Sequence, residues 1–320
     1  METTDLLTSL KEEIAKGLTS SPKYIPSKFF YDAEGSRLFQ LIMRMPEYYL
    51  TDCEYEIFET RKENILKDIY QDKKVFDLIE LGAGDGLKTS LLLHHFVREK
   101  TDFKYVPVDI SEDALENLVN KTTQNIPGIK ISALAGDYFE VLNNLDYCDK
   151  CKKVALFLGS NVGNYHEHES LDFFHQLSSI FRKGDMVITG FDLVKEPWKI
   201  LLAYNDPHGY TRDFNMNLLK RLNNELGANF DLSKFQHHPV YDPEAFIAKS
   251  YILSTDSQDI YIKAMDLTIH FNQWESIFTE QSRKFTISMI ESLAKTTGFR
   301  IVKNYFDKRN YFVDSLWEKI

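Results

Sequence analysis

The fold is decided by residues 75–99, which read VFDLIELGAGDGLKTSLLLHHFVRE. The apolar run over 75–81 predicts a buried strand, and the sequence from about Lys88 to Glu99 predicts a helix. The turn between them, Gly82-Ala-Gly84-Asp-Gly86, is rich in glycine, which permits tight bending and lets a ligand approach the backbone closely. This order of strand, glycine turn and helix is typical of a cofactor site in an α/β protein.

Strands and helices continue to alternate on the C-terminal side of this turn. We expect strands at 104–110, 130–138, 152–160 and 185–193, with helices at 111–125 and 168–182. Such an alternation predicts a parallel, doubly wound sheet. Segments 300–307 and 311–319 then predict a final antiparallel strand pair, which is the usual close of a class I, Rossmann-like methyltransferase sheet. A dinucleotide-binding fold more often continues with parallel strands.

The remaining segments predict a second, smaller α+β domain. Helices are expected at 3–18, in two short pieces within 27–60 that are broken at Pro46, and over 198–230. Strands are expected within 245–272, followed by a helix over 282–299. We therefore predict a core domain formed by 61–195 plus 286–320. A discontinuous substrate-binding or lid domain would be formed by 1–60 plus 196–285.

The charge balance argues against several classes of partner. The 320 residues include 38 Lys and Arg and 48 Asp and Glu, which gives a net charge of −10. We expect no nucleic-acid partner, because binding to nucleic acid needs a basic face. No run of 18 apolar residues is present, and the first 18 residues are acidic and amphipathic. These features predict a cytoplasmic protein without a membrane partner, and we expect a monomer.

Cysteine and histidine spacing gives no sign of a metal site. Of three cysteines, Cys148 and Cys151 form a lone C-x-x-C without the second pair that a zinc site needs. The nine histidines include no H-x-x-x-H pattern, and His237 and His238 are expected in an exposed loop. The sequence therefore predicts no bound metal.

Polar residues after three successive strands separate two classes of cofactor. Glu80 stands just before the glycine turn, where a carboxylate suits a cationic ligand better than a pyrophosphate. Asp109 ends the second strand and could accept the ribose hydroxyls in either class. Asp137 and Tyr138 follow the third strand, where a methyltransferase binds the adenine amino group and places an aromatic beside the ring. We therefore expect S-adenosyl-L-methionine (SAM), with a dinucleotide-binding or non-catalytic Rossmann protein as the alternative.

Seven segments carry a more specific similarity: KFFYDAEGSRLFQLIMRMPEYYLT (28–51), IELGAGDGLKT (79–89), YVPVDIS (105–111), LFLGSNVGN (156–164), GFDLVKE (190–196), AYNDPHGYTRDFNMNLLKRLNNELGANFD (203–231) and FTEQSRKF (278–285). In these segments, and over nearly its whole length, the chain resembles the histidine Nα-methyltransferases of ergothioneine biosynthesis. Several of the segments lie outside the cofactor fold, so the resemblance is to this family rather than to methyltransferases at large. It implies trimethylation of L-histidine to hercynine.

The resemblance implies a set of site residues by motif position. The cofactor would be held by Tyr31, Gly82, Lys88, Asp109, Asp137 and Tyr138, to which the turn itself adds Glu80 and Gly84. The amino-acid pocket would be formed by Tyr48, Gly159, Asn164, Tyr204, Glu280 and Ser282. Glu280 would accept an imidazole N–H, and Ser282 would serve the other ring nitrogen. Tyr31 and Asn164 are the residues assigned to the catalytic centre.

Two departures from the family pattern bear on the substrate. Ser250 stands where the family has a methionine in its pocket, and Trp274 precedes Glu275 where the family usually has a glycine. Both changes are expected near the side-chain end of the pocket. They leave tryptophan, tyrosine or lysine open as alternative substrates, and they leave the number of methyl groups open.

Simpler roles remain for several of these residues. Tyr31 and Tyr48 could be core aromatics, and Glu280 could stabilise the N-terminus of a helix. Asn164 could cap the helix that follows it.

Overall fold

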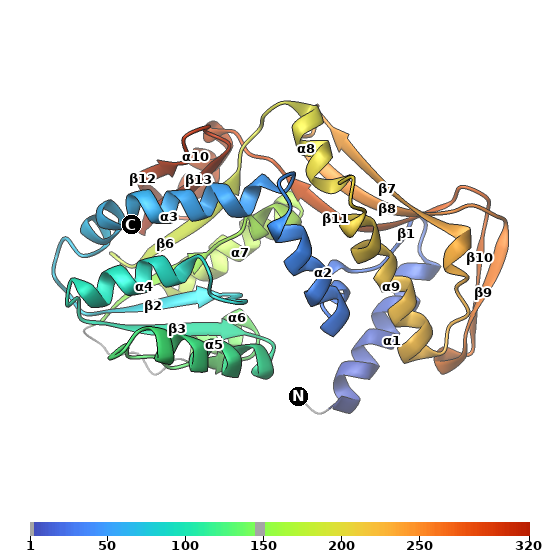
Figure 1. Ribbon diagram of the computed structural model, residues 1–320, viewed down its shortest axis with the longest axis horizontal. Coiled ribbons are helices and arrows are strands. Elements are labelled where there is room, and N and C mark those ends of the chain that lie inside the picture. The colour runs from blue at the N-terminus through green and yellow to red at the C-terminus, as the bar shows by residue number, and fades with distance from the viewer. Residues whose placement is uncertain (1–2, 145–150) are drawn as a thin grey trace. The chain divides into compact units, whose positions relative to one another are not determined.

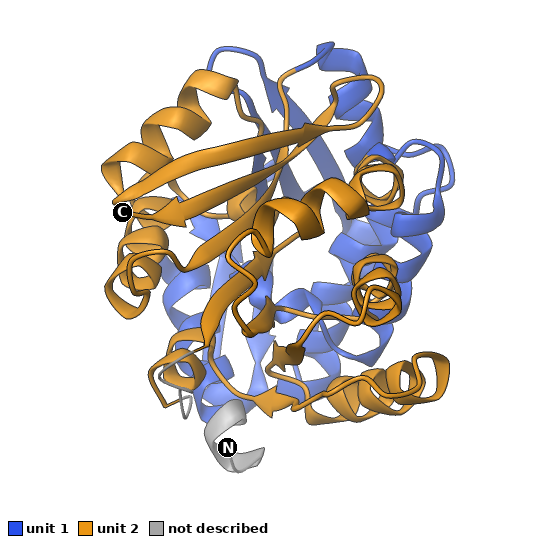
Figure 2. Ribbon diagram, turned by 90° about the vertical axis from the view of Figure 1, so that its left-hand side faces the viewer, with its two compact units in different colours: residues 1–49, 195–283 blue, residues 50–194, 284–320 orange. Residues whose placement is uncertain are grey.

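The computed structural model describes residues 3–144 and 151–320. The chain forms two compact units (Figure 2): unit 1 contains residues 1–49 and 195–283, and unit 2 contains residues 50–194 and 284–320. The predicted boundary at residue 60 falls inside a helix, α3 (Tyr49–Ile69), whereas the division lies at the start of this helix. Most of the segment 50–60 therefore belongs with the larger unit.

Unit 2 is built on a mixed seven-stranded sheet. Its strand order is β12 (Phe299–Phe306), β13 (Phe312–Lys319), β6 (Met186–Asp192), β5 (Lys152–Phe157), β2 (Phe76–Leu81), β3 (Phe103–Asp109) and β4 (Leu134–Ala135). β2 is parallel to both β3 and β5, with Ile79 opposite Val106 and Ala155. β13 is antiparallel to both β6 and β12. A parallel sheet that ends in an antiparallel pair confirms the predicted class I methyltransferase fold.

Helices cover both faces of this sheet (Figure 1). α3, α4 (Thr89–Arg98) and α5 (Glu112–Asn125) lie on one face, and α6 (Tyr138–Asn144), α7 (Glu167–Ile180) and α10 (Ile287–Thr296) lie on the other. On the second face, Phe157 stacks on Phe173 of α7 with ring centroids 4.5 Å apart. Trp317, fully buried in β13, packs against the same helix. Successive side chains of each strand point to opposite faces of the sheet, so residues that face α7 alternate with residues that face α3 and α4.

The sheet has a topological switch point at β2, where the order of successive strands reverses direction. From β2 the chain continues to β3 and β4 on one side, and later to β5 and β6 on the other. Ligands of open α/β sheets bind outside the carboxyl ends of the strands at such a point. The glycine turn follows β2 directly, so the fold puts it at the expected ligand edge.

Unit 1 is an α+β structure. Its four-stranded sheet has the order β1 (Lys23–Tyr24), β11 (Ser276–Arg283), β8 (Ile247–Ser254) and β7 (Phe235–Asp242), and a separate hairpin contains β9 (Gln258–Ile262) and β10 (Leu267–Phe271). Its helices are α1 (Thr3–Thr19), α2 (Ala33–Arg44), α8 (Pro197–Tyr204) and α9 (Tyr210–Leu226). Phe30, at the end of the short helix η1 (Ser27–Phe30), stacks on Phe214 of α9 with centroids 4.4 Å apart and anchors the core.

Several local predictions were wrong. The helix expected over 282–299 begins only at Ile287, because 282–283 belong to β11 and the Thr286 hydroxyl caps the helix by accepting from the Met289 N–H. The strand expected over 130–138 is reduced to two residues. Strand β7 was not expected, and His237 within it is buried rather than exposed. Cys148 lies outside the described residues, so the C-x-x-C pair has no structural account.

Candidate active site

The glycine turn in unit 2 has the backbone that its sequence predicts. Gly82, Gly84 and Gly86 all have positive φ angles, in the region that favours glycine. A side chain at Gly82 would come within 2.7 Å of the Tyr138 hydroxyl oxygen, so the turn and this ring lie close together. A side chain at Gly84 would meet no atom within 4 Å, which means that the turn faces open space there. The turn therefore provides a close backbone approach beside an aromatic ring.

Asp109 ends β3 beside this turn. The Gly84 N–H donates to its Oδ2 at 3.4 Å, and the Ser111 N–H donates to its Oδ1 at 3.1 Å. Each oxygen accepts from a single backbone N–H group, so each keeps further acceptor capacity. A partly exposed carboxylate in this position can accept from a pair of neighbouring hydroxyls.

Asp137 immediately precedes α6, and Tyr138 is the first residue of this helix. Asp137 is exposed and accepts from the Phe139 N–H at 2.9 Å, which fixes its carboxylate at the helix start. Tyr138 packs edge-on against Phe157, and burial raises the pKa of its hydroxyl. The ring is thus held in place, and the carboxylate beside it remains accessible.

Glu80 differs from these carboxylates because it is buried, with 4% of its surface exposed. Its Oε1 accepts from the Thr89 hydroxyl and its Oε2 accepts from the Tyr105 hydroxyl. Burial raises the pKa of Glu80 to about 7, although both hydrogen bonds act in the opposite direction. The side chain connects β2 to the first turn of α4 and to β3, and so supports the glycine turn from beneath.

Lys88 precedes α4, and its ammonium forms an ion pair with the carboxylate of Glu54. Burial alone would lower the pKa of Lys88, but Glu54 outweighs this effect and raises it. The ammonium lies 3.7 Å from the position that a Cβ would take on Gly159. Lys88 and Gly159, predicted for different ligands, are therefore neighbours in unit 2.

Gly159 and Asn164 belong to the segment that follows β5. Gly159 and Ser160 both have positive φ angles, +74° and +57°, before the short helix η2 (Asn161–Asn164). Asn164 is exposed and is not the cap of α7, where the Glu169 side chain accepts from the His166 N–H. The helix-cap role suggested for Asn164 is therefore wrong.

The predicted aromatic residues of unit 1 form one cluster. Tyr31 contacts Phe39 and Phe214 edge-on at 5.6 and 5.8 Å, while 51% of its surface stays exposed. Tyr48 also contacts Phe39 edge-on, with ring centroids 6.3 Å apart. Both rings are therefore partly core residues, but the exposure of Tyr31 leaves a face open to a ligand. Tyr204 ends α8 and is 8% exposed.

Three side chains from neighbouring strands form a polar array in the same unit. Ser250 on β8 lies directly across from Glu280 on β11, and its hydroxyl donates to Glu280 Oε1 at 3.3 Å. On the other side, Ser250 Oγ lies 3.3 Å from the Nε2 of His237 on β7. Burial lowers the pKa of His237 to about 4, so its ring is neutral near pH 7. Glu280 is on a strand, so its suggested role at a helix N-terminus is wrong.

Ser282 and Trp274 have different relations to Glu280. Ser282 follows it by two residues in β11, so both side chains project to the same face of the strand. Trp274 lies in the turn before β11 and is 59% exposed. The strand from Ser276 to Glu280 alone spans about 13 Å, so Trp274 is not beside Glu280 as we had expected.

Sequence reasoning missed Glu54 and His237. Glu54 lies on α3 between the buried residues Cys53 and Ile57, and a charge on an apolar helix face is the signal that could have drawn attention to it. His237 alternates with Phe235 and exposed neighbours in β7, a period-two pattern that the two adjacent histidines obscured.

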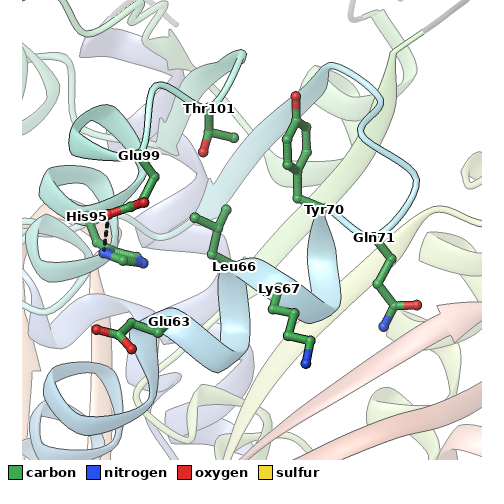
Figure 3. A pocket seen from close by; sticks show the side chains of 8 residues that line it. All are labelled: Glu63, Leu66, Lys67, Tyr70, Gln71, His95, Glu99 and Thr101. Atoms are coloured by element: carbon green, nitrogen blue, oxygen red, sulfur yellow. Dashed lines mark ion pairs between the residues drawn. The ribbon is translucent and has the colours of Figure 1, made fainter.

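A separate cavity of about 710 Å³ lies in unit 2 (Figure 3). It is lined by the C-terminal half of α3 and the end of α4, through Glu63, Leu66, Lys67, Tyr70, Gln71, His95, Glu99 and Thr101. The glycine turn is at the opposite end of α4, about 15 Å away along the helix. None of the predicted site residues lines this cavity.

Two further searches concern metals and membranes. Across residues 3–144 and 151–320, no three His, Cys, Asp or Glu side chains are grouped so that they could hold a metal ion. Within the same part of the chain, no helix has the length and apolar character that a membrane crossing requires.

Comparison with known proteins identifies the family. A family model described as "Histidine-specific methyltransferase, SAM-dependent" matches residues 10–319. The histidine N-alpha-methyltransferase of Mycobacterium tuberculosis (strain CDC 1551 / Oshkosh) is 32% identical over 311 residues, which cover 97% of this chain and 95% of that protein. The enzyme of the same name from Mycolicibacterium smegmatis is 33% identical over 292 residues, which cover 91% and 89%. Ergothioneine biosynthesis protein 1 of Schizosaccharomyces pombe is 26% identical over 88% of this chain but only 37% of its own length.

The family match spans both units, including the glycine turn of unit 2 and the polar array of unit 1. The resemblance drawn from the sequence segments and the expectation of SAM as cofactor are both confirmed. The chain belongs to the family of SAM-dependent, histidine-specific methyltransferases.

Proposed function

We propose that this enzyme transfers methyl groups from SAM to the α-nitrogen of L-histidine and forms hercynine, as in ergothioneine biosynthesis. The observation that carries the proposal is the carboxylate of Glu280, which Ser250 orients on β11 with Ser282 on the same face. A carboxylate and a hydroxyl two residues apart match the two nitrogens of an imidazole ring. Glu280 would accept one ring N–H, and Ser282 would meet the other nitrogen.

The chemistry of unit 2 fits SAM. Asp109 would accept the ribose hydroxyls, Asp137 the adenine amino group, and Tyr138 would lie beside the adenine ring. The open space at Gly84 and the close approach at Gly82 support a ligand against this backbone. Lys88 and Tyr31 would hold the amino-acid end of the cofactor. The Glu80 side chain has both oxygens engaged by protein hydroxyls, so we assign it to supporting the turn rather than to contact with the ligand.

The remaining predicted residues would bind the backbone of the substrate. Tyr48, Tyr204 and the Asn164 amide can bind an α-carboxylate and orient an α-amine without adding charge. The Gly159 carbonyl can accept from the amine. Glu280 and Ser282 of unit 1 would thus recognise the substrate side chain, and Asp109, Asp137 and Tyr138 of unit 2 would bind the cofactor.

The chemical demands on the protein are modest. Bound SAM supplies an activated methyl group on a sulfonium centre. The residues need to align a neutral amine and exclude competing groups, so proximity and orientation give most of the acceleration. No strong general base is required if the amine binds unprotonated or loses its proton to water. Tyrosine faces such as that of Tyr31 can stabilise a growing methylated ammonium.

A second candidate is the same reaction on another amino acid. Ser250, fully buried across from Glu280, is smaller than the methionine expected there from the family. This change leaves tryptophan, tyrosine or lysine as alternative substrates. The Glu280 carboxylate, as an acceptor for an imidazole N–H, favours histidine over tryptophan and tyrosine.

Calorimetric titration tests the proposal. L-Histidine would be titrated into protein loaded with S-adenosylhomocysteine (SAH), with tryptophan, tyrosine and lysine as comparisons. We expect that histidine alone binds, and that a separate incubation of enzyme, histidine and SAM gives three added methyl groups by mass spectrometry. Binding of another amino acid in its place would support the second candidate. We also propose a cytoplasmic monomer, which fractionation and light scattering can test.

A further inference from the structure

A buried carboxylate connects two parts of the site in unit 2. Glu54 on α3 has no exposed surface, and its Oε1 accepts from the Gly159 N–H at 2.8 Å. Its Oε2 forms the ion pair with Lys88. The Glu54 side chain therefore fixes both Lys88, which precedes α4, and the segment at Gly159, which follows β5.

The fold makes room for this side chain. Glu54 lies over Gly190 in β6, where an added Cβ would come within 2.4 Å of Glu54 Oε1 and within 3.0 Å of the Phe312 ring. Any larger residue at this central strand position would displace the carboxylate. The absence of a side chain at Gly190 is therefore part of the arrangement.

A second carboxyl group completes the cluster. Asp314 on β13 lies directly across from Gly190, is fully buried, and receives no hydrogen bond from a nitrogen or hydroxyl donor in the described structure. Burial raises the pKa of Asp314 well above its usual range, and the negative charge of Glu54 adds to this effect. Two ionised carboxylates this close in a buried place would repel each other strongly, and Asp314 has no donor within the described residues to offset that repulsion. The neutral form of Asp314 is therefore favoured, and in that form its hydroxyl can donate to the Glu54 carboxylate.

With this proton the cluster is neutral. Lys88 carries one positive charge, Glu54 carries one negative charge, and Asp314 carries none. A buried ion pair is stable when its remaining lone pairs are satisfied. Glu54 meets this condition through Gly159 and Asp314.

We propose that Glu54 is a positioning residue that couples cofactor binding to amino-acid binding. Its ion pair positions Lys88, which would contact the cofactor. Its hydrogen bond from the Gly159 N–H fixes the left-handed segment that would direct the Gly159 carbonyl toward the substrate amine. Ser160 anchors the same segment by accepting from the Asp192 N–H at 3.0 Å. This inference rests on the proposed function, because the roles of Lys88 and Gly159 come from it.

The coupling has a measurable form. If Glu54 orders both sites, SAH should raise the affinity for histidine, and histidine must raise the affinity for SAH by the same factor. In Glu54→Gln, the side chain has no negative charge to pair with Lys88. Its one acceptor oxygen cannot serve both Lys88 and the Gly159 N–H, as the two carboxylate oxygens do. We expect SAH affinity to fall about tenfold, and the coupling factor to fall close to one.

The experiment is a four-way calorimetric cycle on the full chain. SAH and histidine are each titrated into free protein and into protein saturated with the other ligand, for wild type, Glu54→Gln and Glu59→Gln. Glu59 is an exposed residue on the same helix, so its variant should behave as wild type. A general loss of stability would lower Tm without removing the coupling.

The Asp314 variants decide the matter if Glu54→Gln fails to fold. An asparagine at 314 can donate its amide N–H to Glu54, whereas leucine cannot, so Asp314→Asn should retain much more of the coupling than Asp314→Leu. Equal coupling in these two variants, or full coupling in Glu54→Gln, would overturn the inference while histidine binding by wild type still supported the proposed function. Failure of wild type to bind any of the four amino acids would overturn both.

Discussion

The Nε2 nitrogen of His237 and the hydroxyl oxygen of Ser250 lie 3.3 Å apart on neighbouring strands, and both side chains are buried. A serine hydroxyl has one proton, and Ser250 donates it to Glu280. The His237 Nε2 must therefore carry the ring proton and donate to Ser250. This assignment fixes the tautomer of His237 and makes it the outer member of a chain that orients the Glu280 carboxylate.

Replacement of His237 should weaken recognition of the substrate side chain. In His237→Leu, Ser250 loses its donor and Glu280 is oriented less firmly, so we expect KM for histidine to rise about tenfold with little change in kcat. Steady-state kinetics measure both quantities. His237→Gln can still donate and should recover most of the loss, and the exposed neighbour variant His238→Gln serves as control. An unchanged KM in His237→Leu would show that the array does not position Glu280.

The same histidine should make the stability of the protein depend on pH. Burial lowers the pKa of His237 to about 4 from an ordinary value of 6.5. The nearby Asp206 raises this pKa, whereas His238 and Arg212 lower it further. Between pH 4 and 6.5 the unfolded chain binds more protons at this site than the folded chain, so stability is lost as pH falls. The effect is at most about 3 kcal/mol. Urea unfolding at pH 4.5, 5.5 and 7 should show a smaller pH dependence in His237→Leu than in wild type.

Glu80 should contribute with the opposite sign. Its pKa rises from 4.5 to about 7 in the folded protein because it is buried, so the folded state binds more protons at this site between these values. Stability from this group is therefore full below pH 4.5 and falls by about 3 kcal/mol as pH rises through 7. The free energy of unfolding of Glu80→Gln, minus that of wild type, should therefore increase from pH 5 to pH 8. A constant difference over this range would contradict the raised pKa.

The sequence predicted the parts of the site that are local. The glycine turn, Asp109 and Asp137 each follow a strand, and their positions depend on short-range pattern alone. The polar array could not be predicted in this way, because Ser250 and Glu280 are brought together by the pairing of β8 with β11, and their register shifts at a bulge between Phe278 and Glu280. Glu54 and Gly159 are separated by 105 positions and meet only through tertiary packing.

The cofactor assignment has its own test at Asp109. Removing its carboxylate in Asp109→Ala should lower SAH affinity about ten- to a hundredfold, because two charge-assisted hydrogen bonds to the ribose would be lost. Calorimetry measures this directly. Thermal unfolding should change little, since within the described residues the carboxylate accepts from two backbone N–H groups and from no side chain. Unchanged SAH affinity would count against the ribose role.

A buried ion pair near the end of β6 should be essential for stability. Lys284 Nζ lies 2.8 Å from Asp192 Oδ2, and neither side chain has exposed surface. Replacing only the lysine, in Lys284→Met, removes one charge of this buried pair and should lower the free energy of unfolding by about 3–5 kcal/mol. The double variant Lys284→Met/Asp192→Leu removes both charges and should recover part of that loss, because no buried carboxylate then has to be desolvated at this position. Urea unfolding of the two variants measures the difference. A double variant less stable than the single one would mean that Asp192 stabilises the fold through contacts other than Lys284.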